Sequence, residues 1–152
     1  MHSVRMQDCG EDIRAAVAQG LQLAGRRWRA RLNERLKAIG QTDARCAALA
    51  EIAGSSTGVV QRELSQRLGV EEPTIVRLID ALEAQNWVER RTHSEDRRAK
   101  IVQIKPAAAP VIDQAQEIVA HLQEELFSDM DPADLAACLR VLETLSRKLE
   151  RA

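Results

Sequence analysis

Two stretches of the sequence place arginine where it could bind a polyanion. The first is a helix predicted over 73–85, whose apolar residues form one stripe and whose opposite face is small and polar around Arg77. That face consists of Pro73, Thr74, Arg77, Asp80, Ala81 and Ala84. Arginine and threonine can reach base edges in the major groove of B-DNA, which bulky apolar side chains would block. The pattern favours a DNA-recognition helix, although an ordinary solvated face has a similar composition.

The second stretch is a polar, arginine-rich loop at 92–98, between segments that predict short strands at 88–91 and 99–104. Together they form a β-hairpin. An arginine at a hairpin tip can enter the minor groove of DNA, where the electrostatic potential is most negative. Loops with this much charge are also common on solvated surfaces. The position of the hairpin directly after the helix at 73–85 is what favours a DNA contact.

The elements before this helix have the spacing of a helix-turn-helix. A short helix is predicted at 61–68, and Gly69 suits the left-handed conformation that ends a helix. Pro73 suits the first turn of the helix that follows. A further helix begins after Thr42, a good N-cap residue. We therefore expect a winged helix-turn-helix region over residues 42–105.

The two ends of the chain predict long amphipathic helices. Apolar residues at steps of three and four predict one helix over about 13–39, and two more follow the hairpin, with Asp131 and Pro132 able to cap and start the last one. The winged region is too small to cover all of these apolar stripes. Burial between two subunits is the simplest interpretation, with a bundle inside one chain as the alternative. We expect dimerisation helices at 12–40 and 106–150.

Composition agrees with a mainly α fold that has a small β-wing and six helices. The 152 residues are 45% hydrophobic but only 2% aromatic, which favours helices over a sheet-rich fold in a single domain. The net charge of −1 is unevenly distributed, because basic residues dominate 26–37 and 90–100 and acidic residues dominate from 111 onward. One pole of the molecule can therefore face DNA phosphates while the other faces water.

No segment predicts a membrane span, a metal site or a catalytic site. No apolar run approaches the roughly 18 residues that cross a bilayer, and residues 1–12 are polar, so we expect a cytoplasmic protein without a membrane partner. The cysteines form no CxxC pair, and the histidines lie in a tail, a loop and a helix. There is no glycine-rich phosphate loop. We expect no cofactor, no metal and no enzymatic activity.

The centre of the chain resembles the MarR family of bacterial regulators and, within it, the SlyA-like branch. The resemblance is clearest over 68–83, over 88–91 and in the wing signature Asp-Arg-Arg-Ala-Lys at 96–100. The stretches 28–32 and 35–37 are similar to the first helix of SlyA-like proteins. The resemblance thus covers most of the chain.

The resemblance implies a homodimer whose two winged regions meet successive major grooves of an inverted-repeat operator. Its half-site centres would lie about one helical turn, roughly 34 Å, apart. By this resemblance, Pro73, Thr74 and Arg77 contact bases or the adjacent backbone, and Arg98 enters the minor groove. Phosphate contacts or support of the wing are expected from Gln61, Arg62, Arg90, Arg91, Asp96, Arg97 and Lys100.

Three positions depart from the family pattern. Val60 and Lys105 stand where the family has hydroxyl side chains that cap helices, which costs about 1 kcal/mol of capping energy at each site. Cys46 replaces an aromatic residue near the place where relatives bind small phenolic or carboxylated effectors. Arg31 and Arg45 remain available to hold an anion there, so these three residues mark a ligand pocket. A solvated basic face is the alternative for both arginines.

Two other functions stay open. Part of the family senses oxidants through an N-terminal cysteine, and Cys9 lies near the N-terminus. Those sensors are similar in using tyrosine to stabilise the thiolate, and this sequence has no tyrosine. The other alternative is a helical dimer without any role at DNA. Replacing Arg77 and Arg98 by alanine distinguishes it, because a regulator should lose operator binding while remaining a folded dimer.

Overall fold

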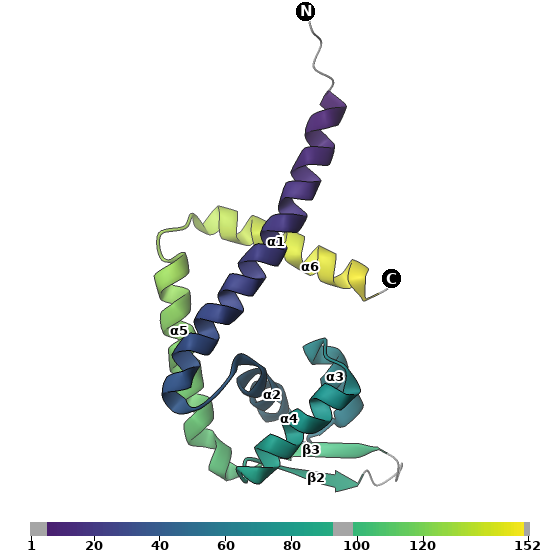
Figure 1. Ribbon diagram of the computed structural model, residues 1–152, viewed down its shortest axis with the longest axis vertical. Coiled ribbons are helices and arrows are strands. Elements are labelled where there is room, and N and C mark those ends of the chain that lie inside the picture. The colour runs from purple at the N-terminus through teal and green to yellow at the C-terminus, as the bar shows by residue number, and fades with distance from the viewer. Residues whose placement is uncertain (1–5, 93–98, 151–152) are drawn as a thin grey trace, which may run out of the picture. The chain divides into compact units, whose positions relative to one another are not determined.

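The structure is a computed structural model that describes residues 6–92 and 99–150, with side chains from Asp12 onward (Figure 1). In chain order the described elements are α1 (Met6–Leu36), η1 (Lys37–Ile39), α2 (Asp43–Ala53), β1 (Val59–Val60), α3 (Gln61–Leu68), α4 (Glu72–Ala84), β2 (Val88–Thr92), β3 (Lys100–Ile104), η2 (Pro106–Ala108), α5 (Ala109–Phe127) and α6 (Pro132–Leu149). Across the described residues this confirms the mainly α fold with six α-helices and a small β-wing. The chain divides into two compact units, and the boundary between them in the sequence falls between Ile118 and Val119.

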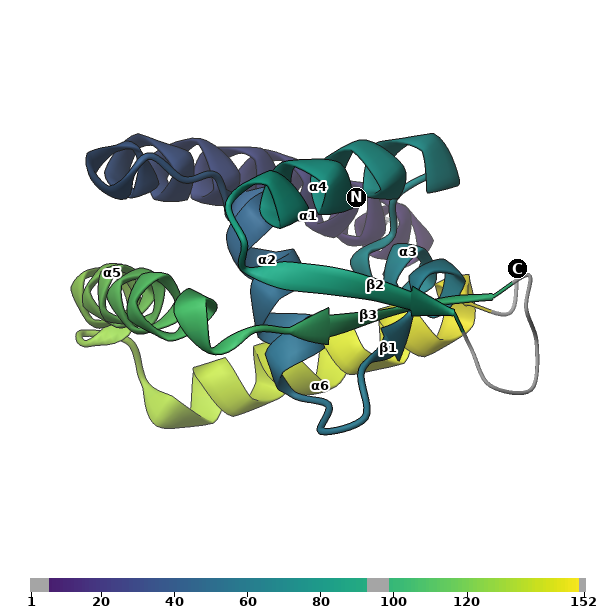
Figure 2. The same ribbon diagram turned by 90° about the horizontal axis from the view of Figure 1, so that it is seen from below.

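The first unit contains the winged helix-turn-helix. Its antiparallel sheet has the strand order β1-β3-β2, and Val102 at its centre pairs with Val59 on one side and with Arg90 on the other. Helices α2, α3 and α4 pack against the sheet and against one another (Figure 2). The buried side chains between them are Ala48, Leu49, Ile52, Val59, Leu64, Ile75, Ile79, Leu82, Val88 and Val102.

Strand β1 is an element that the sequence did not predict. It is two residues long and follows Gly58, which has a φ of +88°. A Cβ atom at residue 58 would lie 2.6 Å from the side chain of Ile101 and 2.8 Å from the carbonyl oxygen of Val102. Only glycine therefore lets the chain approach β3 closely enough to add a third strand.

The helix ends follow local rules of capping. The Thr42 hydroxyl accepts a hydrogen bond from the backbone N–H of Arg45 at 3.4 Å, so the predicted N-cap of α2 is confirmed. Gly69 ends α3 in the left-handed conformation with a φ of +62°. Val60 and Lys105 make no side-chain cap, as their departure from the family pattern predicts. Helix α4 starts at Glu72, one residue before the predicted start.

The second unit contains the end of α5 and all of α6. The Asp131 carboxylate accepts a hydrogen bond from the N–H of Ala133 at 2.7 Å and so caps α6 as predicted. Helix α6 has no buried residue, and its Leu139, Leu142 and Leu149 are exposed. On α1, in the first unit, Ile13, Val17 and Leu21 are exposed at four-residue steps. These apolar faces have the composition of surfaces that a protein partner covers.

Candidate nucleic-acid interface

Helix α4 has one buried and one exposed face. Its buried face consists of Ile75, Ile79 and Leu82, which anchor it in the core of the first unit. Pro73, Thr74 and Arg77, which the sequence predicts to contact bases, are all exposed. Pro73 lies in the first turn of the helix, where its missing N–H removes no hydrogen bond. The helix therefore presents a short polar surface and one long cation to the outside.

Arg90 on β2 joins the wing to this helix. Its guanidinium is ion-paired with Asp80 at 2.7 Å and with Glu83, and it donates hydrogen bonds to the Gln61 side chain and to the Val76 carbonyl, both at 3.1 Å. The backbone N–H of Arg90 donates to the other oxygen of Glu83 at 2.8 Å. Only 20% of the Arg90 side chain is exposed. We call these five residues the Arg90 brace.

The Arg90 brace favours one of the two roles predicted for Arg90 and Gln61. Their polar groups are bonded to each other, and two carboxylates neutralise the guanidinium. A cation that is mostly buried and paired in this way contributes more to the position of a helix than to phosphate binding. Support of the wing is therefore the role that the geometry supports for both residues.

The other predicted phosphate contacts lie on the surface around α3 and the wing strands. Arg62, in the first turn of α3, is exposed and lies 4.0 Å from Glu72. Arg91 is exposed and forms a surface ion pair with Glu89 at 2.5 Å. Lys100 is exposed at the start of β3 and donates to the Thr92 hydroxyl at 3.3 Å. These contacts are weak in water, so each cation can exchange its partner for a phosphate.

Three predicted residues of the wing, Asp96, Arg97 and Arg98, lie outside the described residues. The strands that carry the loop are described up to its two ends, and Thr92 of β2 pairs with Lys100 of β3. The hairpin itself is therefore confirmed, and the roles of the three residues stay predictions.

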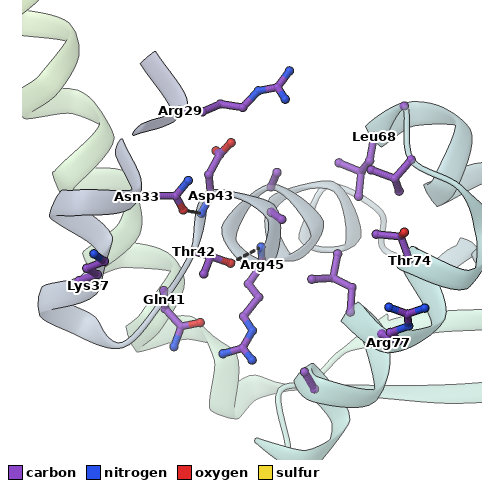
Figure 3. A pocket seen from close by; sticks show the side chains of 16 residues that line it. Arg29, Asn33, Lys37, Gln41, Thr42, Asp43, Arg45, Leu68, Thr74 and Arg77 are labelled. Carbon is purple, nitrogen blue, oxygen red and sulfur yellow. Dashed lines mark hydrogen bonds between the residues drawn. The ribbon is translucent and has the colours of Figure 1, made fainter. Parts of the chain in front are cut away.

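A cavity of about 880 Å³ opens beside α4, within the first unit (Figure 3). Its walls come from the C-terminal half of α1, the start of α2, the turn after α3 and one flank of α4. Four of its lining side chains are basic and one is acidic, namely Arg29, Lys37, Arg45, Arg77 and Asp43. In Figure 3, Arg45 projects from the start of α2 and Arg77 from α4. An excess of cations in a concave site favours an anionic ligand.

The cavity contains only part of the pocket predicted from the sequence. Arg45 lines it, whereas Arg31 and Cys46 do not. Arg31 is instead exposed on α1 and pairs with Glu34 at 3.2 Å. The backbone of Arg45 is fixed at the start of α2, where its N–H donates to the Thr42 hydroxyl.

The α1 side of this cavity was not predicted from the sequence. Arg29, Asn33 and Lys37 follow one another at four-residue steps and so share one face of the helix, a pattern visible in the sequence. Asn33 also ties α1 to α2, because its side-chain oxygen accepts a hydrogen bond from the backbone N–H of Asp43 at 2.8 Å. The spacing of Arg29 and Lys37 could have been recognised in the sequence. That they line a cavity shared with α2 and α4 could not, because this depends on the folded structure.

The described cysteines are free thiols. Cys46 is half-buried on α2, and its burial, together with the nearby carboxylate of Asp43, raises the pKa of the thiol to about 11. A thiol with this pKa is almost wholly protonated at neutral pH and is a poor nucleophile. Cys138 on α6 is exposed. The side chain of Cys9 lies outside the described residues.

Within the described part of the chain, no group of three or more histidine, cysteine or acidic residues is placed to hold a metal ion. No described helix combines the length and the apolar character needed to cross a membrane.

The chain is similar to known transcriptional regulators. A model of the MarR family matches residues 39–99. The crystal structure of transcriptional regulator PA3341 is 36% identical in sequence, superimposes with a TM-score of 0.80, and the match covers 90% of this chain and 99% of that one.

Two more distant structures share the fold. A mutant of MarR from E. coli, complexed with operator DNA, is 23% identical with a TM-score of 0.76, over 86% of this chain and 93% of that one. CouR from Rhodococcus jostii RHA1, bound to p-coumaroyl-CoA, is 22% identical with a TM-score of 0.77. The match covers 85% of this chain and 90% of that one.

Proposed function

This chain belongs to the MarR family of transcriptional regulators, and from that premise we propose that it binds a palindromic DNA operator as a homodimer. The observation that carries the proposal is the exposed face of α4. Pro73, Thr74 and Arg77 are free to enter a major groove, while the Arg90 brace holds the helix against the wing. A similar fold has been crystallised with operator DNA. We further propose that it belongs to the SlyA-like branch, which the wing signature at 96–100 and the sequence of the first helix support.

The proposed dimer uses the terminal segments 12–40 and 106–150, and the winged region 42–105 binds DNA. Support comes from the apolar side chains that α1, α5 and α6 leave exposed, since large apolar surfaces are covered by partners in stable proteins. These side chains are Ile13, Val17, Leu21, Leu23, Leu126, Phe127, Leu139, Val141, Leu142 and Leu149. Two-fold symmetry of such a dimer matches the two-fold symmetry of a palindrome.

At each half-site, Arg77 forms hydrogen bonds with a base, and Pro73 and Thr74 contact bases or the adjacent backbone. Arg98 enters the minor groove from the wing, and the exposed Arg62, Arg91, Arg97 and Lys100 contact phosphates. Asp96 orients a neighbouring arginine through a charge-assisted hydrogen bond. Arg90 and Gln61 act indirectly, by holding the recognition helix.

A small anionic or aromatic effector releases the operator in this proposal. The basic cavity supports it because Arg77 and Thr74 line the cavity and also belong to the DNA-binding face. An anion held between Arg45 and Arg77 would compete with DNA for the Arg77 guanidinium. Benzoate is a suitable probe. It should raise the melting temperature of the free protein and lower its affinity for the operator, and Arg45→Ala should abolish both effects.

Arg31→Ala is the matched control for this effector experiment, because Arg31 lies outside the cavity. It should respond to benzoate as the wild type does. If Arg31→Ala and Arg45→Ala lose their response to benzoate equally, the cavity is not the effector site.

The DNA-binding proposal is tested by footprinting on the DNA upstream of the protein's own gene, followed by fluorescence anisotropy with the protected sequence. Arg77→Ala should reduce the preference for the operator over scrambled DNA by about 10- to 100-fold, and Arg98→Ala should weaken binding to it. Lys148→Ala, on α6, should have no effect. Unchanged binding in both Arg77→Ala and Arg98→Ala would contradict the assigned roles and favour a helical dimer without a DNA role.

The same assay decides the oxidant-sensing alternative. Peroxide treatment should leave the operator affinity unchanged. A loss of affinity that Cys9→Ser prevents would instead establish Cys9 as a sensing thiol.

A further inference from the structure

One large apolar side chain is exposed where dimerisation does not account for it. Among the described residues, the exposed large apolar side chains lie on α1, on α5 and the turn after it, and on α6, with the single exception of Val76. Val76 belongs to the recognition helix α4 and is 38% exposed. It directly precedes Arg77, the proposed base-contacting residue.

Helix stability does not explain a valine at this position. Valine is a weaker helix former than alanine because its branched side chain loses rotamer freedom in a helix. Of its neighbours on the helix, Pro73 and Asp80 are exposed and Ile79 is buried. At 38% exposure, part of the Val76 side chain remains available for a further apolar contact. Its stiffness does fix the direction in which its two methyl groups point.

The Arg90 guanidinium reduces the negative charge beside Val76. Asp80 and Glu83 lie one and two turns further along the same flank of α4, and unpaired carboxylates there would repel phosphates. The Arg90 guanidinium pairs with both of them. The same group donates a hydrogen bond to the Val76 carbonyl at 3.1 Å. Arg90 therefore offsets part of the negative charge of this flank and holds the turn that carries Val76.

We infer that Val76 contacts the C5-methyl group of a thymine in each half-site and selects thymine over cytosine there. This inference rests on the proposed function, because it requires α4 to lie in a major groove. Valine has no side-chain donor or acceptor, so it cannot form hydrogen bonds with a base edge. The thymine methyl is the one apolar group that the four bases present in the major groove. Contact between the two apolar groups removes both from water.

The test is a scan of the operator in which each thymine of a half-site is replaced, in turn and symmetrically, by deoxyuridine. This change removes the C5-methyl group and keeps every hydrogen-bonding atom. At one position it should weaken wild-type binding by about fourfold per half-site, the worth of one buried methyl group. Val76→Ala should weaken binding to the thymine operator by a similar factor. It should lose nothing further on the deoxyuridine operator.

Gln66→Ala is the control, since Gln66 is exposed on α3 and lies outside both the proposed DNA contacts and the proposed dimer helices. It should respond to deoxyuridine as the wild type does. Circular dichroism should show that Val76→Ala is folded, as alanine favours helix. If deoxyuridine weakens the wild type and Val76→Ala equally at every position, Val76 does not contact a thymine methyl. If the wild type shows no preference for any operator, the proposed function fails and this inference falls with it.

Discussion

Replacing Arg90 by methionine removes the charge and hydrogen bonds of the Arg90 brace while keeping an aliphatic stem of similar length. The expected loss of stability follows from the exposed fractions of the three charged side chains. Arg90 is 20% exposed, Glu83 34% and Asp80 58%. Removing one partner of a fully buried ion pair costs about 3–5 kcal/mol, and an exposed pair is worth about 0.2–1 kcal/mol. The Arg90 site is intermediate between a buried and an exposed ion pair, and Glu83 keeps its hydrogen bond to the backbone N–H of residue 90. We therefore expect the free energy of unfolding to fall by about 2 kcal/mol.

The assay is thermal unfolding followed by far-UV circular dichroism, at fixed protein and salt concentrations. A loss of about 2 kcal/mol lowers the melting temperature by about 4–8 °C in a chain of this length. Arg91→Met is the matched control on the same strand. Its ion pair with Glu89 is exposed at 62% and 38%, so it should cost less than about 1 kcal/mol.

The outcome that refutes the reasoning is an equal loss in Arg90→Met and Arg91→Met. A double-mutant cycle with Glu83→Gln gives a second check, since the two changes should be strongly non-additive if they remove the same interaction. Arg90→Met should also reduce operator affinity, because the recognition helix would lose its tie to the wing.

The remaining predictions concern a glycine and a thiol. In urea unfolding, Gly58→Ala should lower the free energy of unfolding by more than about 2 kcal/mol, since its Cβ would lie 2.6 Å from the Ile101 side chain at a φ of +88°. Gly20→Ala is the control. Because open space surrounds residue 20 in α1, this change should raise the free energy of unfolding by about 0.5–1 kcal/mol. Iodoacetamide at neutral pH should alkylate Cys138 well before Cys46. Because folding raises the Cys46 pKa from 9.0 to about 11, its contribution to stability is fully present below pH 9.0 and is lost as pH rises to about 11. In Cys46→Ala the free energy of unfolding should not show this loss. An identical dependence on pH in the wild type and in Cys46→Ala would contradict the prediction.

The helices and the hairpin could be predicted from the sequence because their signals are local. Thr42, Gly69 and Asp131 mark helix ends through side-chain caps or a left-handed residue, and the structure has each of them in that role. Strand β1 could not be predicted in this way. It is two residues long and exists because Gly58 allows a close approach to Val102, which is distant in the sequence.

In the candidate site too, local features could be predicted from the sequence and non-local ones could not. Arg77 and its polar neighbours follow from helical periodicity alone. The Arg90 brace does not, because Gln61 is 29 positions from Arg90 and only the folded sheet brings them together. For the same reason, Arg31, Arg45 and Cys46 are close in sequence but do not share the basic cavity. Cavities are formed by non-local packing, which sequence spacing does not encode.

The most direct test of the account is the ratio of affinities for two duplexes at physiological salt. One contains the palindrome protected in footprinting or selected from random DNA, and the other has the same composition in scrambled order. The account predicts binding of one dimer to the palindrome at least about 10³-fold tighter than to the scrambled duplex. Equal affinity for the two duplexes would contradict it.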